Sequence, residues 1–135
     1  MGLDVGDKRI GIALSDDGEL IASPKETLER RGYKKDIPYL LDLARREDVY
    51  GIVVGLPYSL DGSEGPQAAK VRRFISAIES ETDLRVSTWD ERFTTVAAEE
   101  ILHITEVPGR KHKKSVDRIA AAIILQGYLD AKQTS

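Results

Sequence analysis

The chain contains no cysteine, which excludes disulfide bonds, thiol nucleophiles and cysteine-based zinc sites. Histidine is scarce as well: His103 and His112 are the only two, so a histidine-rich metal centre is also excluded. A metal ion must therefore be held mainly by oxygen atoms, which favours Mg²⁺ or Mn²⁺. The chain also lacks an apolar run of membrane-spanning length and a signal-peptide pattern, and we therefore expect a cytoplasmic protein.

The 135 residues suffice for one hydrophobic core, and no linker or internal repeat divides them, so we expect a single domain over residues 1–135. The net charge of −3 argues against a general attraction to nucleic acid. Positive charge is instead concentrated in the run Arg-Lys-His-Lys-Lys at residues 110–114. This run is either a solvated loop or a segment that attracts a phosphate backbone.

Asp4 lies in the middle of the first strand-like stretch, residues 2–6. Because strand side chains alternate between faces, Leu3 and Val5 point one way, whereas Asp4 points the other way with a glycine on each side of it. Glycine weakens a strand but lets another group approach the backbone closely. A buried carboxylate is costly unless it is paired or binds a metal. Asp4 is therefore a candidate for a metal or phosphate site, the alternative being a solvated surface position.

The hydrophobic pattern predicts an α/β fold with a mixed sheet, in which an antiparallel meander is extended by parallel strands and helices cover both faces. The meander comprises residues 2–6, 10–14 and 20–28, and Pro24 favours an edge position for the last of these. Parallel strands are expected at 50–54 and 84–88, and helices at 36–47, from 66 to 78, at 94–103 and from 115 onward.

Two of the expected helices carry specific start signals. Asp36 is expected to cap the first helix, with Pro38 in its first turn, where a missing N–H is harmless. Residues 105–114 are expected to form a mobile loop that contains the basic run. Ser115 would then cap the last helix and place Asp117 in its first turn, where the helix dipole favours negative charge.

Three acids stand out by their placement: Asp4 within a strand, Glu91 just after a strand, and Asp117 at the expected start of the last helix. Ligands of open α/β sheets bind at the carboxyl ends of strands, and the loop at 55–65 is placed to line the same site. Three clustered carboxylates repel one another unless a cation compensates. Two divalent ions held by such carboxylates can activate a water and stabilise the leaving oxygen of a phosphodiester. Taken singly, each acid also fits an ordinary charged surface residue.

Five segments follow one another along the chain as recognisable motifs. They are Asp4-x-Gly-x-x-x-x-Gly11, Val54-Gly-Leu-Pro57, Leu60-Asp-Gly-Ser-Glu-Gly-Pro-Gln67, Asp90-Glu-Arg-Phe-Thr-Thr95 and Asp117-x-x-Ala-Ala121. Together they resemble the successive motifs of the YqgF family, RuvC-like nucleases of the RNase H-like superfamily described as pre-16S rRNA nucleases or Holliday junction resolvases. Because the resemblance covers nearly the whole chain in order, it is much more specific than any single motif.

The resemblance implies an RNase H-like fold with a five-stranded mixed sheet, and a nuclease that depends on Mg²⁺ or Mn²⁺ and leaves a 5′-phosphate and a 3′-hydroxyl. It also implies that Asp4, Glu91 and Asp117 are both the catalytic acids and the metal ligands. We expect this hydrolase to act in 5′-end maturation of pre-16S rRNA, a step of ribosome biogenesis. The nucleic acid would be bound by basic side chains, namely Lys8, Arg9, Arg92, Arg110, Lys111, Lys113 and Lys114.

The alternatives differ in substrate or in chemistry. A Holliday junction resolvase of DNA recombination normally works as a symmetric dimer. No long hydrophobic dimer helix is apparent, which favours an RNA precursor as partner and a monomer or weak homodimer. The lack of a long apolar run argues against a membrane partner. A non-catalytic nucleic-acid-binding module would gain by replacing acids that repel phosphate, yet all three acids are present. An actin-like ATPase or sugar kinase also begins with Asp-x-Gly near a hairpin, but those folds need two such domains.

Overall fold

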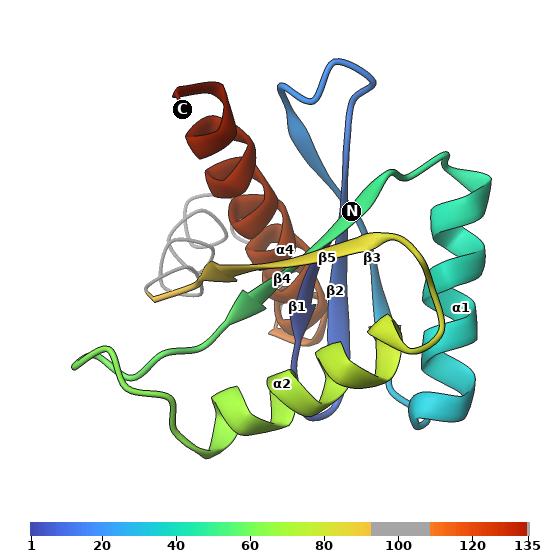
Figure 1. Ribbon diagram of the computed structural model, residues 1–135. Helices are drawn as coiled ribbons and strands as arrows, with labels where there is room; N and C mark the ends of the chain where they lie inside the picture. The colour runs from blue at the N-terminus through green and yellow to red at the C-terminus, as the bar shows by residue number, and fades with distance from the viewer. Residues whose placement is uncertain (93–108, 135) are drawn as a thin grey trace.

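The computed structural model describes residues 1–92 and 109–134, and the side chains of residues 1–92 and 114–133. The strands are β1 (Gly2–Val5), β2 (Arg9–Ser15), β3 (Ala22–Glu29), β4 (Gly51–Leu56) and β5 (Arg85–Asp90). They form one five-stranded sheet in the order β3-β2-β1-β4-β5 (Figure 1). β2 is antiparallel to β1 and β3, whereas β4 is parallel to β1 and β5. The predicted meander extended by parallel strands is therefore confirmed.

Helices cover both faces of the sheet, as predicted. They are α1 (Tyr33–Arg46), α2 (Pro66–Glu79) and α4 (Gly109–Thr134). α1 and α2 pack on one face and α4 crosses the other (Figure 1). Leu3 and Val54 point into the larger core beneath α1 and α2, whereas Ala13 and Val53 point into the smaller core beneath α4. No helix within residues 1–92 and 109–134 has the length and apolar character needed to cross a bilayer.

β3 is the edge strand that its proline predicts. Pro24 pairs with Ala13, whereas Glu26 pairs with Ile12, so Lys25 is an extra residue that forms a bulge. A proline is tolerated at such a position because its missing N–H interrupts no central ladder. β3 therefore closes one side of the sheet and lies alongside α4.

The first helix starts earlier than predicted. α1 begins at Tyr33 after Gly32, whose φ is 106°, and Pro38 lies inside the helix rather than in its first turn. Asp36 is not the cap: it is fully buried, and its carboxylate accepts hydrogen bonds from the backbone N–H groups of Arg31 and Gly32 at 3.0 and 3.2 Å. The prediction assumed that this acid binds N–H groups after it. It binds those before it instead, which lets the helix begin sooner.

The last helix also starts earlier than predicted. α4 begins at Gly109, so residues 109–114 are helical rather than a loop, and Ser115 is buried within the helix instead of capping it. Lysine and arginine are good helix formers, and the basic run therefore continues the helix. Asp117 lies well inside α4, where the helix dipole no longer favours it. The expected helix at 94–103 and the expected loop residues 105–108 lie outside the described residues.

Candidate active site

Glycines let α4 lie directly on the sheet. A Cβ atom on Gly2 would come within 2.8 Å of the Ala121 carbonyl oxygen, and one on Gly11 would overlap the carbonyl group of Asp117. Of the two glycines on either side of Asp4 in its predicted strand, Gly2 admits the close approach that was predicted, and α4 is the group that approaches it. Gly6 instead faces the Arg9 carbonyl oxygen of its own turn. The close packing of α4 on the sheet sets the distance between the acid of α4 and the sheet.

The three predicted acids gather on the face of the sheet that α4 crosses. Asp4 pairs with Gly11 of β2 on one side. On the other side Leu3 pairs with Val54 of β4, so Gly55, the next residue of β4, lies beside Asp4. The backbone of Asp117 lies over Gly11. The carboxylate of Glu91 lies over Gly55 so closely that a Cβ atom there would overlap Oε2. Gly11 and Gly55, on the two strands next to Asp4, therefore each make room for one of the other acids.

Asp4 and Glu91 interact directly. Their carboxyl groups are close enough for a protonated Asp4 to donate a hydrogen bond to Glu91. Burial raises the pKa of Asp4 well above its usual range, and repulsion from Glu91 and Asp117 raises it further. Burial also raises the pKa of Glu91, although the hydrogen bond from Asp4 opposes this shift. The pair therefore favours a shared proton, or a cation in its place.

Asp117 has a different partner. Its Oδ2 accepts a hydrogen bond from Nε of Arg9 at 2.7 Å, in an ion pair whose side chains are 22% and 26% exposed. Arg9, which we expected to bind nucleic acid, thus lies at the start of β2 with its guanidinium turned towards this acid. Nearby, the Thr27 hydroxyl donates to the Lys114 carbonyl oxygen at 2.5 Å and joins α4 to β3. The charge of Asp117 is therefore balanced within the protein.

The donor set fits a hard divalent cation, because it consists of carboxylate oxygens alone. A cation between Asp4 and Glu91 would replace their shared proton, whereas Asp117 is already paired with Arg9 through Oδ2. Among the residues that the structure describes, no three histidine or acidic side chains are already arranged around one common point. The site is thus built as an acid pair beside an acid–arginine pair, and its predicted catalytic and metal-binding roles stay predictions.

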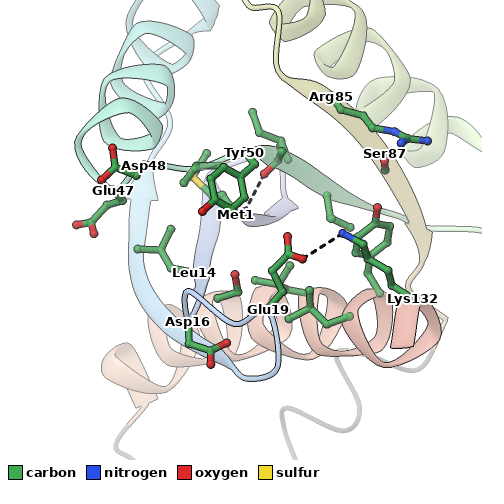
Figure 2. A pocket seen from close by; sticks show the side chains of 18 of the residues that line it. Met1, Leu14, Asp16, Glu19, Glu47, Asp48, Tyr50, Arg85, Ser87 and Lys132 are labelled. Carbon is green, nitrogen blue, oxygen red and sulfur yellow. Dashed lines mark hydrogen bonds and ion pairs between the residues drawn. The ribbon is translucent and has the colours of Figure 1, made fainter. Parts of the chain in front are cut away.

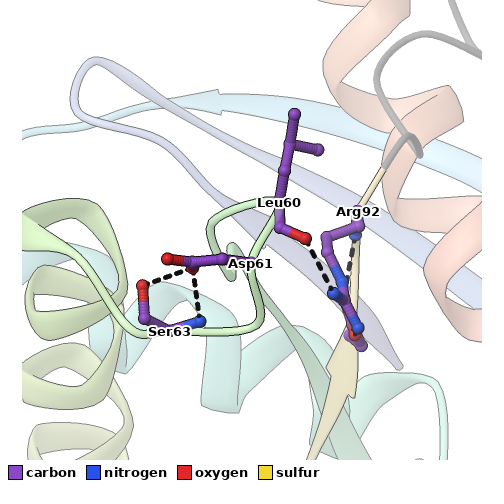
Figure 3. A network of polar contacts seen from close by, with 5 residues as sticks. Leu60, Asp61, Ser63 and Arg92 are labelled. Atoms are coloured by element: carbon purple, nitrogen blue, oxygen red, sulfur yellow. Dashed lines mark hydrogen bonds and ion pairs between the residues drawn. The ribbon is translucent and has the colours of Figure 1, made fainter.

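Arg92 joins the end of β5 to the loop that follows β4. Its guanidinium binds the Asp90 carboxylate, with Nη2 2.6 Å from Oδ2, and donates to the Leu60 carbonyl oxygen at 3.5 Å (Figure 3). It also lies 6.0 Å from the centre of the Tyr58 ring. These contacts hold the loop beside Glu91. The expected binding of nucleic acid by Arg92 stays a prediction.

Hydrogen bonds within the loop fix its shape. The Asp61 carboxylate accepts hydrogen bonds from the Ser63 backbone N–H at 2.9 Å and the Ser63 hydroxyl at 2.6 Å, which lower the pKa of Asp61 (Figure 3). Gly62 between them has φ 88°, a left-handed conformation that favours glycine. Glu64 binds Arg72 of α2 at 2.9 Å, so the far end of the loop is held as well.

Two further residues of the predicted nucleic-acid surface have described side chains. Lys8 is exposed in the turn between β1 and β2, and Lys114 is exposed with Nζ 3.7 Å from Glu29 of β3. Three further side chains lie outside the described residues, although their backbone belongs to α4; they are Arg110, Lys111 and Lys113.

Residues 1–131 match the family model RuvX, described as Holliday junction resolvase. The chain belongs to the RuvX family. A RuvX relative from Clostridioides difficile (strain 630) is 49% identical over 135 residues, covering 100% of this chain and 96% of the relative. Another from Syntrophus aciditrophicus (strain SB) is 47% identical over 131 residues, covering 97% and 87%. Both are named "Putative pre-16S rRNA nuclease".

Solved structures with the same fold include RuvC proteins. A structure described as T. thermophilus RuvC in complex with Holliday junction substrate superposes with a TM-score of 0.63 at 16% identity, covering 99% of this chain and 94% of that one. A second, Thermus thermophilus RuvC, gives 0.56 at 17% identity, with 98% and 95% covered. At this identity the likeness concerns the fold. RuvX and YqgF are names of the same family, so the predicted family is confirmed. The RNase H-like fold and the nuclease class are confirmed as well.

A cavity of about 280 Å³ lies at the other end of the strands, where β4 begins (Figure 2). The Met1 amine donates there to the Gly51 carbonyl oxygen at 2.9 Å, and acidic side chains such as Glu19 and Asp48 lie around it. None of the three predicted acids lines this cavity. The candidate site is therefore a separate place on the molecule.

Sequence reasoning placed the segment 55–65 at the site, but it did not predict that Gly55 makes room for Glu91 and did not find the partner of Asp117. A signal for Gly55 was present, because Val54 and Leu56 are apolar and alternation then places the glycine on the face opposite to them. The pair of Arg9 and Asp117 joins residues 108 positions apart. No local pattern reports such a contact.

Proposed function

We propose that this RuvX chain is a divalent-metal-dependent nuclease that hydrolyses phosphodiester bonds in 5′-end maturation of pre-16S rRNA, with Asp4, Glu91 and Asp117 as its active site. The observation that carries the proposal is the convergence of the half-buried Asp4 carboxyl with Glu91 and Asp117 on the face of the sheet that α4 crosses. Such an arrangement disfavours folding unless a cation uses it. The names of the curated relatives support the choice of RNA.

All three acids take part in this mechanism. Asp4, Glu91 and Asp117 would hold divalent cations, which when bound would lower the pKa of a water and stabilise the leaving oxygen. The water oxygen bonds to phosphorus, the bond to O3′ breaks, and O3′ takes up a proton, which gives a 5′-phosphate and a 3′-hydroxyl. Arg9 positions Asp117, and Arg92 positions the loop next to Glu91.

The test is hydrolysis of a labelled pre-16S rRNA 5′ leader in Mn²⁺, by the wild type and by Asp4→Asn. We expect the variant to lose at least about a hundredfold in rate, since the amide keeps the shape of the carboxyl but not its charge. Asp83→Asn is the matched control, because Asp83 is exposed just before β5, at the end of that strand opposite to Glu91, and should leave the rate unchanged. Equal rates for Asp4→Asn and the wild type would reject the assignment.

A four-way DNA junction is the second substrate in the same assay, because the RuvX family description names Holliday junction resolution. Resolution requires two sites in a symmetric dimer, so paired nicks that become faster as the chain dimerises would favour this function. A non-catalytic module would bind RNA but release no heat with millimolar Mn²⁺ in calorimetry.

A further inference from the structure

A groove of about 250 Å³ lies between the turn that joins β1 to β2, the start of α1 and the first half of α2. Its polar walls come from Asp7, Arg30, Tyr33, Lys70 and Arg73. We propose that this groove binds the backbone of a single-stranded nucleic acid beside the bond to be cut. The inference rests on the proposed nuclease function and extends its binding surface to the face that α1 and α2 cover.

The groove is positively charged although the whole chain carries −3. Within the described part of the chain Asp7 is the one acid that lines it, and Asp7 is bound to Lys70 at 3.3 Å. Arg30 pairs with the buried Asp36 carboxylate at 3.6 Å, whereas no carboxylate of the described residues pairs with Arg73, which therefore gives the groove its net positive charge. Positive charge in a concave site on an acidic protein is the electrostatic signature of phosphate binding.

Further exposed cations lie where the β1–β2 turn meets the start of α1. The backbone N–H of Arg30 donates to the Lys8 carbonyl oxygen at 2.9 Å, which places the β1–β2 turn next to the start of α1. The exposed cations nearby on the chain are Lys8, Arg31, Lys34 and Lys35. A strand bound in the groove would therefore meet further positive charge beside the β1–β2 turn.

Tyr33 provides an aromatic surface within this charge. It is 40% exposed, and its ring lies edge-on to the buried Phe74 at 6.0 Å between centres. The Arg30 guanidinium lies 5.8 and 5.6 Å from the two ring centres and donates to the Gly6 carbonyl oxygen at 3.0 Å. A tyrosine held rigid yet exposed among cations suits a base that stacks while its phosphates bind.

The groove is close to the acids although it lies on the other face. Asp7, on its rim, follows Asp4 by three residues, which span at most about 10 Å even when fully extended. One strand that passes over the β1–β2 turn can therefore touch both places. The contact would hold substrate on the side away from α4.

The test measures binding of a 20-nucleotide single-stranded RNA by fluorescence anisotropy in EDTA, so that cleavage does not contribute. The groove variant is Lys34→Glu with Arg73→Glu, and the matched control is Arg45→Glu with Arg85→Glu, which changes the net charge equally at the distant end of α1 and the start of β5. We expect the groove variant to bind at least tenfold more weakly. Its slope of log Kd against log salt should fall by about 1.4, whereas the control should change Kd less than threefold.

Tyr33→Ala should weaken binding at least fivefold and Tyr33→Phe should not, because only the first loses the stacking surface. Urea unfolding of each variant verifies that it is folded. If Tyr33→Ala does not fold, the variant with Lys34→Glu and Arg73→Glu still tests the groove. The proposal is overturned if the groove and control variants lose the same affinity for single-stranded RNA. It is also overturned if the groove variant loses more affinity for a duplex DNA probe than for single-stranded RNA. RNA hydrolysis by the wild type in Mn²⁺ is read separately, so failure of the groove and failure of the nuclease function are distinguishable.

Discussion

At the scale of single residues, the ion pair between Arg9 and Asp117 competes with a cation for the same carboxylate. We predict that Arg9→Gln binds Mn²⁺ about fivefold more tightly in calorimetry without nucleic acid, because a partly exposed pair of this kind contributes roughly 1 kcal/mol. Arg9→Lys keeps the competing charge and should stay near the wild-type affinity. Unchanged or weaker Mn²⁺ binding by the glutamine variant would contradict this competition.

Asp4 makes the stability of the metal-free chain depend on pH. Because its pKa is raised in the folded state, the folded chain holds a proton that the unfolded chain has released above about pH 4. The free energy of unfolding should therefore fall as pH rises from about 4 towards the raised pKa of Asp4, by up to about 1.4 kcal/mol per pH unit for one proton. Asp4→Asn removes this dependence and should gain stability over the wild type between pH 5 and 8.

Urea unfolding in EDTA at several pH values measures this difference. Asp7→Asn is the control, because its carboxylate is exposed and its removal should leave the slope of stability against pH unchanged. The prediction fails if Asp4→Asn is the less stable protein at pH 8.

At the scale of elements, α4 depends on the absence of side chains beneath it. Gly11→Ala would place a Cβ atom against the carbonyl group of Asp117, and helix backbone cannot move aside as a flexible side chain can. We predict a loss of at least about 2 kcal/mol in the free energy of unfolding by urea. Gly18→Ala, whose nearest neighbour would be 3.5 Å away in an exposed turn, should change it by less than about 0.5 kcal/mol.

The strands were predictable from sequence because alternation and apolar runs are local signals. The buried run of β4 and the proline of edge strand β3 each read correctly. Helix starts were less predictable, because they depend on contacts made after folding. Asp36 binds N–H groups that precede it, and the basic run before Ser115 continues a helix that packs on β2 and β3.

The candidate site was predictable in its residues but not in its contacts. The flanking glycines of Asp4 and the position of Glu91 after a strand indicated acids on one face, and the structure brings them together. That Asp117 faces Arg9 follows only from the way α4 lies across β2. Long-range pairing of this kind has no counterpart in local periodicity.

At the scale of the whole molecule, the three acids belong to segments that meet only in the folded chain: β1, the residue after β5, and α4. A cation bound by them would link these segments, and a ligand that binds only the folded state stabilises it by about 2.7 kcal/mol at a hundred times its Kd. We predict that saturating Mn²⁺ raises the Tm at pH 7.5 by about 10 °C relative to EDTA. Asp4→Asn should lose this shift while Asp7→Asn keeps it, and a wild-type Tm that Mn²⁺ leaves unchanged would show that the acids hold no ion in common.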